Sequence, residues 1–191
     1  ATKTALQTLP SHVLNNLDVL VNNAGLALGL EPADKTDFAD WQQMVNTNIL
    51  GLIHLTHEIL PFMVANNDGY IINLSSTAGN YPYFGGNVYG ATKAFVTQFS
   101  LNLRADLVGK NIRVSNIEPG LCGGTEFSNI RFHGDDAKAA QVYDSVQYVT
   151  PQDIANMVAW LIEQPKHVNI NRIEVMPTAQ TFAGLKVVKD L

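Results

Sequence analysis

Four short apolar runs constrain this chain most strongly, because each has the length and composition of a buried β-strand. They are rich in isoleucine, valine and leucine and do not alternate cleanly with polar residues, which is typical of strands covered on both faces in a parallel sheet. The runs are Leu17 to Val21, Tyr70 to Leu74, Ile112 to Ile117, and Arg172 to Met176.

Segments with the period of an α-helix separate these runs. The first extends from about Asp37 to Ala65, with apolar residues three and four positions apart, and the second from about Asn87 to Val108. The third begins at Thr150-Pro151, a cap followed by proline in the first turn, and continues to about Glu163. Strands alternating with helices predict right-handed β-α-β units. We therefore predict an α/β fold, doubly wound around a parallel sheet.

The bulk composition excludes several classes of protein. A chain of 191 residues without repeats or linkers is interpreted as one domain spanning residues 1–191. A net charge of −5 argues against nucleic-acid binding, and no apolar run reaches the roughly 18 residues of a membrane span. The single cysteine, Cys122, cannot form an internal disulfide. A reducing compartment, the cytoplasm, is therefore expected, without nucleic-acid or membrane partners.

Tyr89 and Lys93 form the strongest candidate catalytic pair, because residues four positions apart in a helix project from one face. The reference pKa of a tyrosine is ~10, which makes the phenol a poor acid-base catalyst at neutral pH. An ammonium at roughly 5 Å, in an effective dielectric of ~20, favours the phenolate by about 3 kcal/mol and lowers this pKa by roughly two. The pair can then exchange a proton with an alcohol or carbonyl oxygen. The alternative is an ordinary amphipathic helix with a packed tyrosine and a solvated lysine.

Ser76 and Asn48 are candidate partners of this pair. Ser76 follows the second strand-like run and lies thirteen residues before Tyr89. Doubly wound sheets bind ligands at the carboxyl ends of their strands, so a hydroxyl there can hydrogen-bond the substrate oxygen. A cap of a turn is the alternative for Ser76. Asn48 lies inside a helix, where its amide competes with the backbone, and holding a water beside Lys93 is a functional reason for its place.

Five short motifs occur in one order along the chain. They are Asn22-Asn23-Ala24-Gly25, Asn48-Ile49-Leu50-Gly51, Asn73-Leu74-Ser75-Ser76, Tyr89-Gly90-Ala91-Thr92-Lys93, and Pro119-Gly120. In this order and spacing they resemble the signatures of the short-chain dehydrogenase/reductase family. A tyrosine and lysine four apart occur by chance, whereas five ordered motifs together are specific.

The resemblance implies a role for each motif and a single Rossmann-type domain that forms homotetramers or homodimers. Tyr89 would be the acid-base residue, Lys93 would lower its pKa and hold the nicotinamide ribose, and Ser76 would orient the substrate. Asn48 would anchor a proton-relay water. The implied cofactor-binding residues are Asn22, Asn23, Ala24, Gly25, Asn48, Tyr89, Lys93, Pro119, Gly120 and Thr125.

Later segments resemble one branch of the family, the NADP-dependent 3-hydroxy acid dehydrogenases, which include malonic semialdehyde reductase and serine dehydrogenase. These segments are Gly123 to Ser128, Arg131-Phe132, Gly134 to Asp136, and His167 to Asn171. The branch oxidises serine, allo-threonine and related 3-hydroxy acids, or reduces the matching semialdehydes. Arg131 is the candidate for the substrate carboxylate, because a guanidinium binds a carboxylate bidentately. A solvated arginine is its alternative. The expected substrate-binding residues are thus Ser76, Tyr89 and Arg131.

The glycine-rich turn TGxxxGxG, which this family places after its first strand, does not occur in the sequence. Its glycines let the backbone approach the cofactor pyrophosphate at a helix N-terminus. We therefore expect that the N-terminal β-α-β part of the Rossmann-type fold is not represented in this chain, which would start within the third helix of a family member. The choice of NADP is implied by the branch, and NAD is the alternative.

Two other functions stay open on the sequence. One is a reductase of another carbonyl substrate, such as a 3-oxoacyl thioester or a diketone. The other is a non-catalytic, cofactor-binding relative, against which the intact Tyr89 and Lys93 argue.

Several residues with reactive or bulky side chains have simpler interpretations. His54 and His57 have no third ligand near them in the sequence, so no metal site is expected. Cys122 is expected to be a small buried hydrophobe. Trp41 and Trp160 lie among apolar helix positions and are expected in the core.

Overall fold

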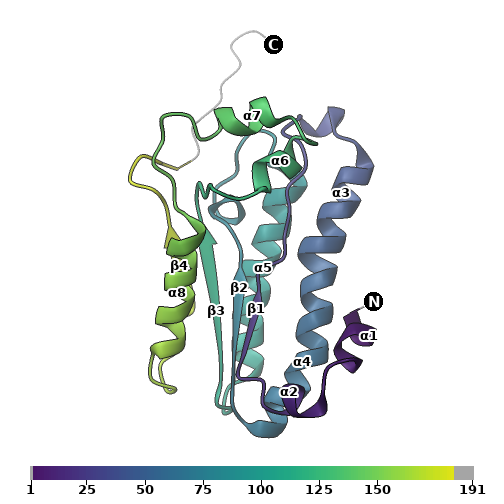
Figure 1. The fold of residues 1–191 in the computed structure, drawn as a ribbon, viewed down its shortest axis with the longest axis vertical. Coiled ribbons are helices and arrows are strands. Elements are labelled where there is room, and N and C mark those ends of the chain that lie inside the picture. Colours follow the sequence, from purple (N-terminus) through teal and green to yellow (C-terminus); the bar gives the residue numbers. More distant parts are fainter. Residues whose placement is uncertain (1, 183–191) are drawn as a thin grey trace.

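The computed structural model describes residues 2–182 and contains a four-stranded parallel sheet at its centre (Figure 1). Every strand predicted from the sequence is present, with its ends shifted by at most two residues. The strands lie side by side in chain order: β1 (Val19–Asn22), β2 (Gly69–Leu74), β3 (Ile112–Pro119) and β4 (Arg172–Val175).

Helices connect these strands, as the sequence pattern predicts. The described α-helices are α1 (Thr2–Gln7), α2 (Ser11–Asn15), α3 (Phe38–Val45), α4 (Leu52–Asn66), α5 (Asn87–Asp106), α6 (Phe127–Arg131), α7 (Asp136–Gln141) and α8 (Pro151–Glu163). Short turns of other helix types are η1 (Ala33–Lys35), η2 (Asn46–Gly51) and η3 (Thr77–Gly79). The predicted capping signal at the start of α8 is confirmed, because Thr150 and Asp153 form a reciprocal capping box.

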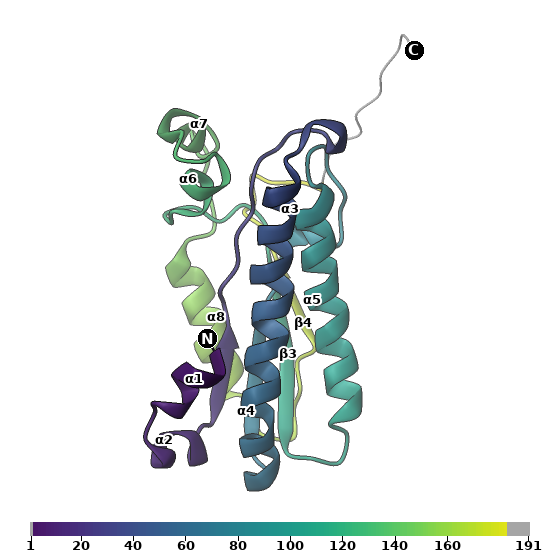
Figure 2. The ribbon, with the colours of Figure 1, turned by 90° about the vertical axis from the view of Figure 1, so that its right-hand side faces the viewer.

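The helices lie on both faces of the sheet, so the predicted doubly wound, Rossmann-type α/β architecture is confirmed (Figure 2). On one face Ile71 of β2 and Val114 of β3 pack with residues of α4 and α5. On the other face Ile72 of β2 and Ile117 of β3 pack with Leu161 of α8. Each such aliphatic side chain contributes about 1.5–3 kcal/mol when fully buried.

The helix predicted from about Asp37 to Ala65 is one helical stretch with a π-helical turn, η2, in its middle. Asp37 caps α3 by accepting a hydrogen bond from the Ala39 N–H, at 2.9 Å. A wider turn inside a helix often accompanies a functional site, and this one contains Asn48. By length and composition alone the stretch Phe38–Asn66 could cross a membrane, a test that the core helices of soluble proteins also pass.

The expectation for Trp160 is wrong, since this side chain is 48% exposed. Helix α8 faces the sheet with Ile154, Met157 and Leu161, which recur at helical spacing, and Trp160 projects away from that face. Trp41 is half-buried, and its indole N–H donates a hydrogen bond to the Asn87 side chain at 3.2 Å.

Candidate active site

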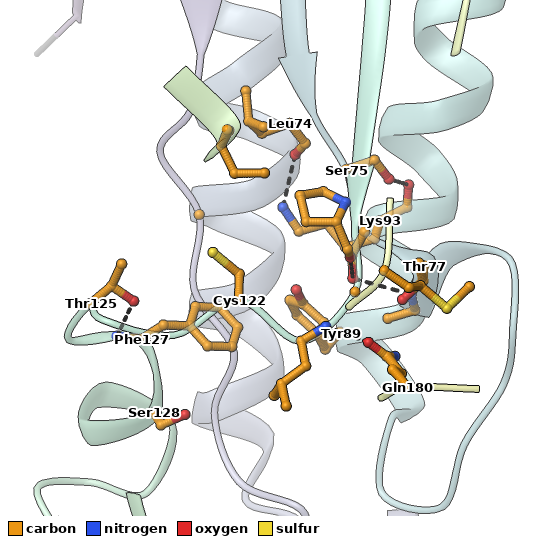
Figure 3. Close-up of a pocket in the computed structure, with 18 of the residues that line it drawn as sticks. Leu74, Ser75, Thr77, Tyr89, Lys93, Cys122, Thr125, Phe127, Ser128 and Gln180 are labelled. Carbon is orange, nitrogen blue, oxygen red and sulfur yellow. Dashed lines mark hydrogen bonds between the residues drawn. The ribbon is translucent and has the colours of Figure 1, made fainter. Parts of the chain in front are cut away.

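A cavity of about 790 Å³ lies where the carboxyl ends of the strands meet α5, α6 and α8 (Figure 3). Doubly wound sheets bind their ligands at this edge. Nine of the twelve site residues predicted from the sequence line the cavity: Asn23, Gly25, Ser76, Tyr89, Lys93, Pro119, Gly120, Thr125 and Arg131. Three others, Asn22, Ala24 and Asn48, do not line it.

Tyr89 lies at the base of the cavity and is only 8% exposed. Its ring packs edge-on against Phe127, with the ring centroids 5.9 Å apart. Burial raises the pKa of the phenol to about 12, although a hydrogen bond with Ser76 and the charge of Arg131 each lower it. The expected acidification of Tyr89 is therefore not met by the groups of this chain, because desolvation of the phenolate outweighs the nearby positive charge.

Lys93 lies one helical turn after Tyr89, with its ammonium 5.9 Å from the tyrosine ring centroid. Figure 3 shows the side chain reaching the end of β2, where Nζ donates a hydrogen bond to the Leu74 carbonyl oxygen at 2.9 Å. Burial lowers the pKa of Lys93 to about 8. The sequence argument assumed a permanent charge in a polar medium, and the buried position of this lysine removes part of that charge.

The two serines at the end of β2 have different surroundings. The Ser75 hydroxyl is buried against α5, where it donates to the Lys93 carbonyl oxygen at 2.6 Å. The Ser76 hydroxyl donates to the Pro119 carbonyl oxygen at 3.2 Å and accepts from the Ala78 N–H at 3.1 Å. Ser76 thus caps η3, and its hydrogen bond with Tyr89 lowers the pKa of the phenol; its role toward a substrate stays a prediction.

Asn48 lies behind the cavity wall, in the π-helical turn. Its Oδ1 accepts from the Leu26 N–H at 2.9 Å, and its Nδ2 donates to the Leu26 carbonyl and to the Thr92 hydroxyl. A methyl group added at Gly25 would lie 3.2 Å from Lys93 Nζ and 3.3 Å from Asn48 Oδ1. Asn48 is therefore beside Lys93, as expected, but both of its amide N–H groups already bind protein atoms.

Part of the Asn22 to Gly25 motif has a structural role, and part of it lines the cavity. Asn22 is buried, and its Nδ2 joins β1 to α4 and β2 by donating to the Thr56 hydroxyl at 3.0 Å and to Asn73 Oδ1 at 2.8 Å. Ala24 is exposed. Only Asn23 and Gly25 face the cavity, so the resemblance assigned the whole motif to the cofactor although part of it holds the sheet together.

Arg131, on α6, lies on the opposite wall from β2 and is held by neutral oxygen atoms. Its Nη2 donates to the Tyr83 hydroxyl at 2.7 Å, and its Nε donates to the Gly29 carbonyl oxygen at 3.2 Å. The guanidinium carbon is 5.6 Å from the ring centroid of Tyr89. Within residues 2–182, no carboxylate forms an ion pair with Arg131.

Tyr83 is a cavity residue that the sequence argument missed. It lies in the loop between η3 and α5, lines the cavity and holds Arg131. Tyrosines in loops follow no helix or strand period, so spacing gave no signal. The one available signal was its position in an aromatic stretch between the candidate residues Ser76 and Tyr89.

The chain matches the model of the short chain dehydrogenase family over residues 1–135. It is 70% identical over 190 residues to a probable NADP-dependent dehydrogenase of Haemophilus influenzae, covering 100% of this chain and 75% of the relative. It is 58% identical over 182 residues to the NADP-dependent 3-hydroxy acid dehydrogenase of Escherichia coli K12, covering 95% and 73%. A solved structure of serine dehydrogenase in its closed form with NADP+ superposes with a TM-score of 0.96 at 56% identity, covering 100% and 76%.

Proposed function

This chain belongs to the short-chain dehydrogenase family, and on that premise we propose that it transfers a hydride between NADP and a small 3-hydroxy acid such as serine. The reverse reaction reduces the matching semialdehyde. The observation that carries the proposal is the meeting of Ser76, Tyr89 and Lys93 with the cation of Arg131 in one cavity. This combination supplies a proton-transfer group and an anion-binding group within one small-molecule site.

The cavity wall fits the nicotinamide and ribose half of NADP. An ammonium has three N–H donors, and in the described part of the chain Lys93 Nζ uses one of them, on the Leu74 carbonyl. Gly25 leaves free the space beside Lys93 that a side chain would fill. Lys93 would hold the ribose hydroxyls, and Asn23, Pro119, Gly120 and Thr125 would line the cofactor. When bound, NADP supplies the hydride acceptor or donor.

Tyr89 exchanges the proton in this proposal, and Ser76 orients the reacting oxygen. With a pKa raised to about 12, the phenol is protonated at neutral pH and can donate to the carbonyl oxygen of a semialdehyde. Oxidation of the hydroxy acid requires the phenolate, which positive charge near Tyr89 favours. Asn48 would keep its expected role beside Lys93 in the proton path through Oδ1, which accepts from the Leu26 N–H and has a second lone pair that can accept from a water.

Arg131 supports an anionic substrate. The half-buried Arg131 guanidinium is held by a hydroxyl and a carbonyl, close to Tyr89, and no carboxylate in the described residues 2–182 pairs with it. A 3-hydroxy acid carries its carboxylate two bonds from the carbon that reacts. The substrate carboxylate is therefore assigned to Arg131, with the hydroxyl at Ser76 and Tyr89.

Replacing Tyr89 by phenylalanine tests the proposed chemistry. Tyr89→Phe removes the proton-transfer group, so NADP-linked oxidation of serine should fall by about 10²–10⁴-fold. Binding of NADP, measured by fluorescence titration, should persist. Tyr70→Phe is the matched control: this tyrosine is also buried, but its hydroxyl bonds Ser115 outside the cavity. Turnover retained by Tyr89→Phe would contradict the assignment.

We also propose that residues 1–191 belong to one Rossmann-type domain, and that the protein forms a cytoplasmic homotetramer or homodimer. The lone cysteine supports a reducing compartment, since Cys122 has no partner for an internal disulfide. Light scattering of the purified protein would measure the assembly, and a monomer at micromolar concentration would contradict it.

A further inference from the structure

A fully buried carboxylate lies directly beneath the site, at the end of β3. Glu118 is 0% exposed and accepts five hydrogen bonds. Arg172 of β4 donates two of them, from Nε at 2.9 Å and from Nη2 at 2.7 Å. Burying an ion pair costs desolvation energy that the attraction does not always repay, so such a pair is weak evidence for a purely stabilising role.

The partners of Glu118 hold the segment that follows Ser76. Asn80, at the end of η3, donates from Nδ2 to Glu118 at 2.7 Å and to Glu174 at 2.9 Å. Its Oδ1 accepts from Arg172 Nη2 at 3.0 Å. Glu118 and Glu174 are neighbours in the sheet register, so the Asn80 amide bridges two adjacent carboxylates, while Arg172 forms its ion pair with Glu118.

The Glu118 carboxylate also contacts α5, on the other side of the site. Thr97 donates to Glu118 at 3.2 Å, and its hydroxyl oxygen lies 3.0 Å from the Ser75 hydroxyl oxygen. Ser75 in turn donates to the carbonyl oxygen of Lys93. Glu118 also directly precedes Pro119, whose carbonyl oxygen accepts from the Ser76 hydroxyl.

We propose that Glu118 and Arg172 form a positioning pair that fixes the Ser76 turn against the Pro119 carbonyl and so orients the Ser76 hydroxyl toward Tyr89. Neither side chain lines the cavity, so the pair acts through Ser76. Asn80 holds the Ser76 turn in place from one side, and Thr97 and Ser75 hold it from the other. The inference rests on the proposed role of Ser76 in the reaction.

Glu118→Gln tests the pair, because glutamine has the same shape without the charge. A displaced Ser76 should lower kcat for serine oxidation by roughly tenfold or more, since small misplacements of reacting groups are costly. The KM for NADP should change less than about twofold. Ser76 helps to lower the pKa of Tyr89, so the rise of kcat with pH should also move to higher pH. Arg172→Gln, at the 42% exposed end of the pair, should cause the same changes even if Glu118→Gln fails to fold.

Arg113→Gln is the matched control. Arg113 lies at the opposite end of β3 and donates to backbone carbonyls at the end of α8, including those of Leu161 and Gln164. Its loss should lower the melting temperature without changing kcat per folded molecule or the pH profile. The proposal is overturned if Glu118→Gln and Arg172→Gln behave like Arg113→Gln. An unmutated protein without turnover would instead contradict the proposed function.

Discussion

The two walls of the cavity are built in different ways. The wall with the proposed catalytic residues Ser76, Tyr89 and Lys93, called the catalytic wall, comes from the end of β2 and the first turns of α5, and Lys93 is bonded there to the Leu74 backbone. The wall with the proposed substrate residue Arg131 and its partner Tyr83, called the substrate wall, comes from the short helix α6 and a loop. Regular elements fix a side chain more firmly than loops do, and loops vary more readily between relatives.

The substrate wall is attached by a small set of bonds. Arg131 exchanges two hydrogen bonds with Gly29: the Gly29 N–H donates to the Arg131 carbonyl at 2.8 Å, and Arg131 Nε donates to the Gly29 carbonyl. Near the end of α6, His133 Nε2 lies 3.2 Å from a carboxylate oxygen of Asp40 on α3. Under the proposed function, the chemistry would belong to the wall built on regular elements, and the choice of substrate to the wall built on a loop and a short helix.

The largest effect on the two walls is expected from Lys93→Met, which removes the ammonium group of the catalytic wall. Turnover should fall by on the order of 10²-fold or more, because the variant loses both the charge beside Tyr89 and the ammonium that would hold the ribose hydroxyls. Stability at about pH 7 should not fall with it. Burial lowers the pKa of Lys93 to about 8, so between that pH and its ordinary 10.5 the unfolded chain binds a proton that the folded chain releases. The stability of the unmutated protein therefore rises with pH across this window, and the variant should lack the rise.

Urea unfolding at about pH 7 and about pH 9.5, beside turnover assays, measures both properties of Lys93→Met. Lys110→Met removes an exposed lysine and should leave both properties unchanged. A variant that loses stability at neutral pH in proportion to its activity would show that Lys93 is a structural residue, and the contrast between the two walls would disappear.

A smaller and more selective effect is expected from Arg131→Ala on the substrate wall. Hydrogen bonds to a charged group contribute about 1.5–3 kcal/mol, so the KM for serine should rise by roughly 10–100-fold. The KM for an uncharged alcohol of similar size should be nearly unchanged. The kcat for oxidation should fall to the same extent for both substrates, because the Arg131 charge also lowers the pKa of Tyr89. Arg131→Lys keeps the charge without the two-pronged geometry and should be intermediate. Equal increases of KM for charged and uncharged substrates would contradict the assignment of the substrate carboxylate to Arg131.

The contrast between the walls also separates what the sequence predicts from what it does not. The strands, the helix starts and the set Ser76, Tyr89 and Lys93 follow from periodicity, capping signals and fixed spacing. The π-helical turn at Asn48 and the partners of Arg131 depend on segments distant in sequence, such as Leu26 and Tyr83. No local pattern encodes these contacts.

The pKa of Tyr89 shows the physical limit of the sequence argument. Spacing places Lys93 near the phenol, and the separation of 5.9 Å from the ring is close to the assumed value. The depth of burial was not available from spacing, and it raises the pKa of the tyrosine while lowering that of the lysine. Burial is a property of the packed fold, and here it outweighs the pair interaction that the sequence reveals.

The smallest effect is expected from Asp40→Asn, which removes the carboxylate that lies 3.2 Å from His133 Nε2. His133 is largely exposed, and even a fully charged exposed pair contributes only about 0–1 kcal/mol, so the melting temperature should hardly change. The KM for serine should rise by no more than about threefold, and high salt should abolish the difference from the unmutated protein. Glu58→Gln, which removes the longer His57–Glu58 contact at 3.9 Å, is the control and should have no effect. If Asp40→Asn instead matches Arg131→Ala, the attachment of α6 governs substrate binding as much as the arginine does, and the substrate wall has to be regarded as one cooperative unit.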